Sequence, residues 1–216
     1  MHIDIVADVA CPWCFIGKRR LERALAQRPD LLVTRSWRAF QLNPDMPAEG
    51  IPRALYLAAK FGSPRHAARS CAAIAAAGRG EGIDFAFDRI GRTPNTLRAH
   101  RLIRFAANEG RGDAVVEALF TAYFHDGLDI GNIDVLAASA GRAGLDYDAS
   151  RLYLESEAGV DEVRAEDRRA RRLGIHAVPC FVLERGYAIS GAQEPEMFLP
   201  LFDIAAGIGN PAAAEA

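Results

Sequence analysis

The chain has 216 residues, with 26 basic and 28 acidic side chains and 50% hydrophobic residues. This composition excludes a disordered tail, a collagen-like repeat and a disulfide-stapled miniprotein, and the length is sufficient to bury a real core. A net charge of −2 provides no basic field, so we expect neither nucleic acid nor a membrane as a partner.

The N-terminal segment carries Asp4 and Asp8 among apolar residues, and these acids interrupt the continuous apolar stretch that a secretory signal needs. No window approaches the ~18 apolar residues that span a bilayer. We therefore expect a soluble, cytoplasmic protein. In that reducing compartment a Cys-x-x-Cys motif is catalytic or metal-binding more often than it is structural.

The first elements follow a strand–helix–strand pattern. Residues 3–9 are rich in β-branched side chains and predict a buried strand. A helix is predicted from Pro12 to a point before Pro29, because proline suits the first helical position. Residues 32–42 alternate in polarity and predict a second strand. Cys11 and Cys14 therefore lie at the first junction between a strand and a helix.

Alanine-rich helical periodicity dominates the middle of the chain, and strand patterns are absent there. The predicted helices cover residues 53–61, 64–78, 96–108, 112–124, 133–143, 148–155 and 160–173. Asn95 is a candidate N-cap, because its side chain can accept a backbone N–H of the next turn.

Strand character returns after Gly174. Residues 180–183 and 187–190 predict a hairpin connected by residues 184–186, and a final helix is predicted over residues 194–206. The fold class is therefore α/β, with a small domain made of residues 1–44 and 174–208. An all-helical insertion at 45–173 interrupts it, and residues 209–216 are expected to form a flexible tail.

The Cys11-Pro12-Trp13-Cys14 motif carries the chemistry that the sequence predicts. A thiolate, rather than a thiol, attacks a disulfide, and the unpaired N–H groups at a helix N-terminus stabilise a negative charge. Cys11 precedes the first helical residue, and Cys14 follows about one turn later on the same face. We expect Cys11 to be the accessible nucleophile and Cys14 the more buried resolving thiol.

Two plainer interpretations of the cysteines stay open. A zinc site needs a second pair of ligands, whereas Cys71 and Cys180 stand alone without a histidine at ligand spacing. Inert core cysteines are the other alternative. No bound metal is therefore expected.

Val178-Pro179 stands just before the returning strands and forms the second half of the predicted site. A cis bond is rare for X-Pro in general, but at this place it would bring the proline backbone against the cysteines. The backbone of Val178 could then pair with an extended substrate as an added strand.

These features resemble the DsbA-type thioredoxin-fold oxidoreductases and, within them, the cytoplasmic FrnE-like subgroup. The resemblance rests on Cys11-Pro12-Trp13-Cys14, on the helical insertion, on Gly174-Ile175-His176-Ala177-Val178-Pro179 and on the stretches 8–20, 40–47, 95–103 and 190–193. It implies a thioredoxin-like fold (β-α-β … β-β-α) interrupted by an all-helical insertion, thiol–disulfide exchange, and a cis Pro179 beside the cysteines.

The chain departs from the family pattern at two positions. Many thioredoxin-fold enzymes place a buried acid six residues before the first cysteine, where this chain has Ile5, so the acid–base group that serves Cys14 is unassigned. An aromatic residue commonly follows the proline, where this chain has Cys180. Cys180 is a candidate third thiol of the site, with plain packing in a buried strand as the alternative.

Three further residues have both a functional and a structural interpretation. Trp13 either contacts substrate or packs on the insertion. His100 is either a proton shuttle facing the cysteines or an ordinary histidine of a helix. Gln193 either binds the polar end of glutathione or caps the final helix. Cys71, in an alanine-rich helix, is expected to be a small core residue.

The leading functional hypothesis is a thiol–disulfide oxidoreductase in which Cys11 and Cys14 react and Trp13, Val178 and Pro179 bind the substrate. Its partner would be a protein thiol or disulfide, or a glutathione-linked substrate. No bound cofactor is expected, while glutathione as co-substrate and a homodimer stay open. A glutathione-dependent transferase or isomerase, like the related kappa-class transferases and 2-hydroxychromene-2-carboxylate isomerases, is the first alternative. A non-catalytic thioredoxin-fold binding module is the second.

Overall fold

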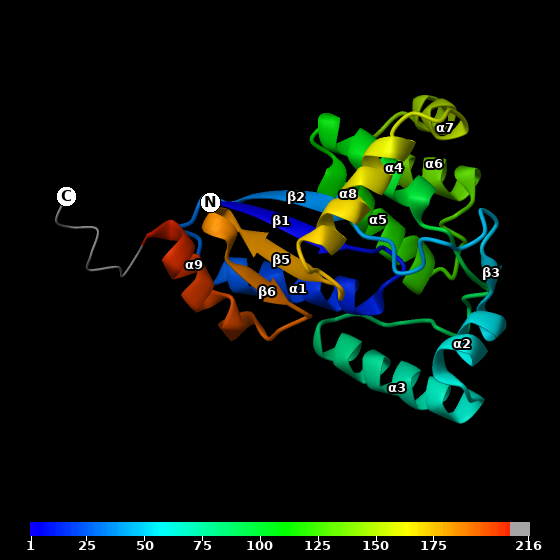
Figure 1. Ribbon diagram of the computed structural model, residues 1–216, viewed down its shortest axis with the longest axis horizontal. Helices are drawn as coiled ribbons and strands as arrows, with labels where there is room; N and C mark the ends of the chain where they lie inside the picture. Colours follow the sequence, from blue (N-terminus) through cyan, green and yellow to red (C-terminus); the bar gives the residue numbers. More distant parts are fainter. Residues whose placement is uncertain (208–216) are drawn as a thin grey trace.

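A computed structural model describes residues 1–207 and contains a mixed four-stranded sheet in the order β2-β1-β5-β6 (Figure 1). The central strand β1 (His2–Ala7) is parallel to β2 (Thr34–Ala39) and antiparallel to β5 (Cys180–Leu183). The strand β6 (Ala188–Ser190) completes the hairpin with β5 through the short 3-10 turn η1 (Glu184–Gly186). Segments from both ends of the chain therefore build one sheet, as the sequence predicts.

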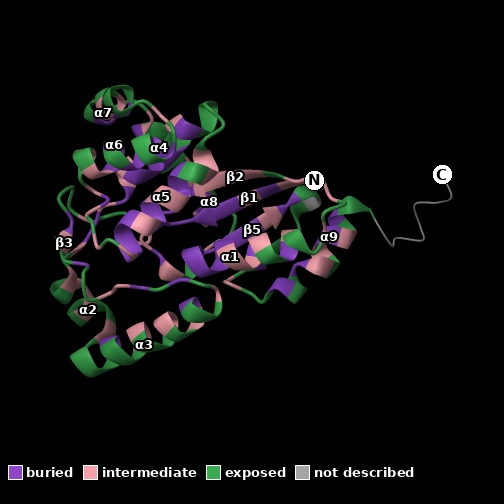
Figure 2. Ribbon diagram, turned by 180° about the vertical axis from the view of Figure 1, so that it is seen from behind, coloured by how far each residue is buried: buried purple, intermediate pink, exposed green. Residues whose placement is uncertain are grey.

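Helices cover both faces of this sheet. The helix α1 (Pro12–Ala26) lies on one face, and α8 (Val160–Arg172) crosses the other face next to β2 (Figures 1 and 2). Because both faces are covered, Ile3 and Ile5 on one side of β1 and Val6 on the other are all buried. The helix α9 (Leu199–Ala206) packs through Phe198 and Phe202 beside α1 and β5.

The insertion consists mainly of the helices that the sequence predicts. Besides α8, they are α2 (Arg53–Phe61), α3 (Pro64–Gly80), α4 (Leu97–Asn108), α5 (Gly112–Phe124), α6 (Ile133–Arg142) and α7 (Tyr147–Glu155). The prediction of an all-helical insertion is wrong in one detail, because β3 (Ile51–Pro52) pairs with β4 (Arg92–Thr93). Two-residue strands are too short to leave a periodic pattern in the sequence.

The two halves of the insertion differ in burial. Figure 2 shows α2 and α3 mostly exposed or intermediate, whereas α5 carries a large part of the core. On α5, Phe120 stacks on Phe15 of α1 with 4.7 Å between ring centroids. This aromatic contact fixes the insertion to the helix that carries the two cysteines.

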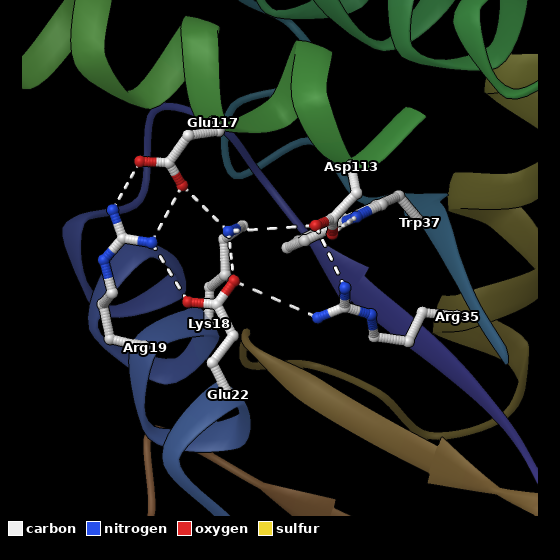
Figure 3. Close-up of polar contacts among 7 residues, drawn as sticks. All are labelled: Lys18, Arg19, Glu22, Arg35, Trp37, Asp113 and Glu117. Carbon is white, nitrogen blue, oxygen red and sulfur yellow. Dashed lines mark hydrogen bonds and ion pairs between the residues drawn. The ribbon is translucent and has the colours of Figure 1, made fainter. Parts of the chain in front are cut away.

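An ion-pair network reinforces the same junction between α1 and α5 (Figure 3). Lys18 is buried, and its Nζ lies 2.8 Å from Glu117 Oε2 on α5 and also pairs with Glu22 on α1. Asp113, at the start of α5, accepts hydrogen bonds from Arg35 (3.1 Å) and Trp37 (3.0 Å) of β2. The network therefore connects α1, α5 and the edge strand β2.

Most predicted boundaries agree with the structure within two residues, but two elements differ more. The second strand, predicted over residues 32–42, ends at Ala39 because the Gln41 amide donates to Asp167 of α8 (2.9 Å) rather than to β1. The final helix, predicted over residues 194–206, is divided into the 3-10 turn η2 (Pro195–Met197) and α9. Pro200 has no N–H to donate to the preceding turn, so one continuous helix cannot form there.

The predicted flexible tail at 209–216 lies outside the described residues. Among residues 1–207, none of the helices combines the length and the apolar character that crossing a lipid bilayer requires. The boundaries of the two predicted domains stay a prediction.

Candidate functional site

Cys11 occupies the N-cap of α1, where the chain turns out of β1. Its backbone is extended (φ −94°, ψ 114°), its amide donates to the Asp8 carbonyl at 3.0 Å, and Pro12 begins the helix. The amide of Cys14 donates to the Cys11 carbonyl at 3.0 Å, which places both residues within the first turn. The Cys11 side chain makes no capping hydrogen bond within the described part of the chain, and both cysteines lie at the positive end of the helix dipole.

The two thiols differ only slightly in exposure. Cys11 is 5% exposed and Cys14 is 1% exposed, and neither forms a disulfide within residues 1–207. Cys14 is therefore the more buried of the two, as expected, whereas Cys11 is less accessible than we expected. Burial raises the pKa of the Cys14 thiol well above its ordinary value, and the neighbouring Cys11 side chain raises it further. Cys14 is thus a protonated thiol in this state at neutral pH.

The Val178–Pro179 peptide is cis, and it lies against Cys11. Cys11 Sγ is 3.7 Å from the Val178 carbonyl oxygen, a weak thiol-to-carbonyl contact across 167 positions of sequence. Beyond Pro179 the chain enters β5, where Cys180 pairs with Val6 of β1 and with Ser190 of β6. The sheet register therefore holds the proline loop beside the N-terminus of α1.

Asp8, three residues before Cys11, carries a buried carboxylate. It is 1% exposed; its Oδ1 accepts the Ala10 amide at 3.1 Å and its Oδ2 accepts the Leu42 amide at 2.8 Å. His100 of α4 brings its Nε2 to 3.6 Å from Asp8 Oδ1, and this nitrogen is buried without a hydrogen-bond partner among the described residues. The turn that leads to the cysteines therefore carries a buried carboxylate with an imidazole next to it.

The family model of the DSBA-like thioredoxin domain matches residues 2–202 of this chain, which include both cysteines and Pro179. The chain belongs to this DSBA-like family. Its α/β fold class, a thioredoxin fold with a mixed sheet, is therefore confirmed, while membership of the FrnE-like subgroup stays a prediction.

Proteins similar to this chain match it over nearly its whole length. A structure described as a probable DsbA oxidoreductase from Streptomyces coelicolor is 35% identical, with a TM-score of 0.88, and covers 98% of this chain and 92% of its own. The uncharacterized protein YwbO of Bacillus subtilis is 27% identical over 199 residues, which are 92% of this chain and 94% of that protein. A 2-hydroxychromene-2-carboxylate isomerase (17% identity, TM-score 0.69, 96% and 95% coverage) shares the fold.

A cavity lies beside this DSBA-like site, between the loop that follows β2 and the helix α2. Its volume is about 640 Å³, and its lining is mostly apolar, with Leu42, Met46, Ile51 and Tyr56 among the lining residues. The Leu42 amide donates a hydrogen bond to Asp8, so the cavity adjoins the turn that carries Cys11.

Trp13 is 39% exposed at the start of α1, which favours the substrate-contact interpretation of this residue over a ring packed on the insertion.

Asn95 positions the same loop, although it is not the N-cap of α4. The N-cap is Thr96, one residue after Asn95. The Asn95 side chain nevertheless accepts a hydrogen bond from a backbone amide of the first turn, that of Leu97, at 2.9 Å. Asn95 Nδ2 also donates to the Met46 carbonyl at 2.6 Å. The side chain therefore connects the start of α4 to the loop beside the cysteines.

The remaining predicted residues have mainly structural surroundings. Cys180 is buried in β5, and burial raises the pKa of its thiol, as its packing interpretation requires. Gln193 does not cap the final helix, because Glu194 is the N-cap of η2 and Phe198 that of α9. Its Nε2 donates to the Ser190 carbonyl at 2.9 Å. Cys71 is only partly buried, on α3, rather than a core residue, because α3 packs loosely against the rest of the chain.

The sequence reasoning missed Asp8 as a site residue. Ile5, at the position of the usual buried acid, is indeed an apolar core residue, and the buried acid stands three residues before Cys11 instead. Its signal was present in the sequence, since an isolated acid between a buried strand and a cysteine motif needs a partner to be tolerated in the interior.

Proposed function

We propose that the chain is a thiol–disulfide oxidoreductase that works through Cys11 and Cys14. The observation that carries the proposal is the position of Cys11 at the uncapped N-terminus of α1, with Cys14 one turn behind it and the Val178 carbonyl 3.7 Å from its sulfur. In this arrangement Cys11 is the slightly more exposed thiol, and Cys14 is a second thiol within its reach. The membership of the DSBA-like family supports the same chemistry.

The reaction runs in two exchange steps. The Cys11 thiolate attacks one sulfur of a substrate disulfide; the substrate S–S bond breaks, and its electron pair leaves on the other substrate sulfur. Cys14 then loses its proton and attacks Cys11 Sγ, so that the mixed disulfide breaks and the second substrate sulfur leaves as a thiolate. The substrate is reduced by two electrons and the protein is left with a Cys11–Cys14 disulfide. A thiol pool, of protein or glutathione type, reduces it again.

Oxidation of a substrate dithiol is the same sequence in reverse, and the proposal covers both directions. In either direction, Trp13 and the Val178-Pro179 backbone hold the substrate beside Cys11, and the apolar cavity near Leu42 receives a neighbouring side chain. Glutathione as a co-substrate, a cytoplasmic location and a homodimer stay predictions.

The test compares the wild type with Cys11→Ser and Cys14→Ser in insulin reduction and in oxidative refolding of a reduced protein. We expect Cys11→Ser to lose at least about 10²-fold in rate, because no other thiol replaces the nucleophile. Cys14→Ser should accumulate a mixed disulfide that mass spectrometry detects. Cys71→Ser, which removes a thiol of α3, is the matched control and should keep full activity.

The other outcomes separate the alternatives. Full activity of both Cys11→Ser and Cys14→Ser would contradict the proposal. Glutathione-dependent conversion of a small electrophile that survives Cys14→Ser would favour the transferase or isomerase alternative, whose fold is shared by the isomerase described above. Inactivity of the wild type in all of these assays would favour a binding module.

A further inference from the structure

Cys14 must give up a proton before it can resolve a mixed disulfide, but it is enclosed by protein. It is 1% exposed, and burial holds its pKa well above the ordinary value. The position that supplies a buried acid in many related folds holds Ile5, an apolar core residue of β1. A different group must therefore accept the proton, or the second exchange step is slow at neutral pH.

Asp8 and Cys14 belong to one tight turn, because the Cys11 amide donates to the Asp8 carbonyl at 3.0 Å and the Cys14 amide donates to the Cys11 carbonyl at 3.0 Å. The backbone N–H of Asp8 lowers the pKa of the Cys14 thiol, whereas the charge of its carboxylate raises it, after the larger effects of burial and of Cys11. The carboxylate is fixed by the amides of Ala10 and Leu42, which approach from opposite sides of the turn. Asp8 is thus a rigid, buried acceptor next to the resolving thiol.

His100 of α4 lies next to the Asp8 carboxylate. Its Nε2 is 3.6 Å from Asp8 Oδ1, slightly longer than a hydrogen bond, and has no partner among the described residues. A buried nitrogen without a hydrogen bond destabilises the folded state, so its presence here needs an explanation. A ring nitrogen that alternately receives and releases a proton is such an explanation, because a permanent partner would block the transfer.

His100 is also one of the residues that line a cavity of about 540 Å³ between β2, α4 and α8. Glu166 and Arg104 line the same cavity, and their side chains are partly exposed, so it opens to the surface there. His100 therefore stands between the buried carboxylate of Asp8 and a route to solvent that does not pass through the substrate site.

We propose that Asp8 and His100 form a proton relay that connects Cys14 with this cavity. The inference rests on the proposed function. As the Cys14 S–H bond breaks, its proton passes to the Asp8 carboxylate and its electron pair attacks Cys11 Sγ, while the bond from Cys11 to the substrate breaks and leaves a substrate thiolate. His100 takes the proton from Asp8 and releases it into the cavity. Asp8 is a catalytic residue, and His100 is a positioning residue that acts through it.

Other titratable and charged groups lie on the elements around this pair. They are Cys11 at the N-cap of α1, Tyr123 on α5, Arg104 on α4 and Glu166 on α8, with Asp167 and Arg171 of α8 bound to the neighbouring Gln41. Burial raises the pKa of Tyr123 to about 12, and the charge of Asp8 contributes. Asp167 binds the Gln41 amide and, unlike Asp8, forms an ion pair with Arg171, so its charge is already compensated. Within the described residues, His100 is the group that reaches the Asp8 carboxylate and stands without a bond of its own.

The test measures both exchange steps in one reaction, in which the reduced protein reacts with the aromatic disulfide dithiobis(nitrobenzoate). Release of the first nitrothiophenolate reports the attack by Cys11, and release of the second reports resolution by Cys14. We expect Asp8→Asn and His100→Gln to slow the second release by about tenfold or more at pH 7 and to change the first release little. The difference in second-release rate between these variants and the wild type should disappear as the pH rises, because hydroxide then removes the proton from Cys14 directly.

Asp167→Asn is the matched control, because Asp167 is also a buried acid that holds the same loop through a backbone amide. An equal slowing in Asp167→Asn would assign the effect to loop structure and overturn the relay. Wild-type second-step rates and pH profiles in His100→Gln and in Asp8→Asn would also overturn it. If Asp8→Asn does not fold, His100→Gln decides alone. Failure of the proposed function looks different: Cys14→Ser would then release the second nitrothiophenolate as fast as the wild type.

Discussion

Gly17 of α1 packs directly against the ring of Pro179. A Cβ added at Gly17 would lie 2.7 Å from Pro179 Cγ and 3.2 Å from the ring of Phe181. Both neighbours are rigid, since one belongs to the proline ring and the other to a buried aromatic side chain of β5. The absence of a side chain at Gly17 therefore allows α1, and with it the two cysteines, to lie against the cis-proline loop.

We expect Gly17→Ala to destabilise the protein by up to about 2 kcal/mol. Alanine is favoured over glycine in a helix by about 1 kcal/mol, but overpacking a rigid contact costs about 1–3 kcal/mol. Urea unfolding measures the difference. Gly141→Ala is the control, because Gly141 lies in α6 with open space around its Cβ position, and it should be neutral or stabilising. Equal effects of the two substitutions would contradict the packing argument.

The buried Cys14 thiol should make the reduced protein less stable at alkaline pH. Because its folded pKa is raised, the unfolded chain loses this proton above the ordinary thiol pKa of about 8.5, while the folded protein keeps it. The unfolded state then binds fewer protons, so stability falls as pH rises, by up to about 1.4 kcal/mol per pH unit, until the folded pKa is reached. Below pH 8 this contribution is flat.

Urea unfolding of the reduced wild type and of Cys14→Ala between pH 7 and pH 10 measures this effect. Both proteins keep Cys180 and Tyr123, whose pKa values are also raised by burial, so their contributions cancel in the comparison. The wild type should lose stability more steeply than Cys14→Ala. Parallel pH profiles would show that Cys14 ionises as easily in the folded protein as in the unfolded chain.

Lys18 is expected to be the most sensitive member of the network in Figure 3. Burial alone would raise the pKa of Glu117, but hydrogen bonds from Arg19 and Lys18 outweigh it and hold that pKa below its ordinary value. Lys18→Met should therefore cost about 2 kcal/mol in urea unfolding, because it leaves Glu117 partly buried with one cation fewer. The stabilisation by Glu117 is present above its ordinary pKa and should fade as acid protonates it.

Arg151→Met provides the comparison for Lys18, because Arg151 pairs with Asp134 on the exposed surface of the insertion. Exposed pairs contribute about 0–1 kcal/mol, so this substitution should have little effect. A cost for Lys18→Met no larger than that for Arg151→Met would show that burial does not strengthen the network.

Arg101 holds the end of α7 in place and should not be replaceable by lysine. It is buried and donates to the carbonyls of Tyr153 (2.8 Å), Ser156 (2.6 Å) and Ala158 (2.7 Å). Lysine lacks the planar fork, so Arg101→Lys should cost about 2–3 kcal/mol and increase hydrogen exchange in α7. Arg98→Lys on the same helix, which removes a single long contact to Gly131, should leave α7 exchange unchanged.

Local patterns predicted most of the elements, because helix and strand formation depend on neighbours within a few positions. The helix from Pro12, the hairpin around residues 184–186 and the helices 53–61 and 112–124 are in the structure as predicted. The strand after residue 32 was predicted too long, since Asp167, far away in sequence, removes Gln41 from the sheet. The pairing of β3 with β4 was missed for the same kind of reason.

The sequence by itself determined the reactive pair. Cys11 and Cys14 stand one turn apart at a helix start that Pro12 defines, and these relations involve only adjacent residues. Only the tertiary structure decided what surrounds them. The Val178 carbonyl, the Asp8 carboxylate and the His100 imidazole meet there from three distant segments. No local periodicity encodes such a meeting, because it results from sheet register and helix packing across the whole chain.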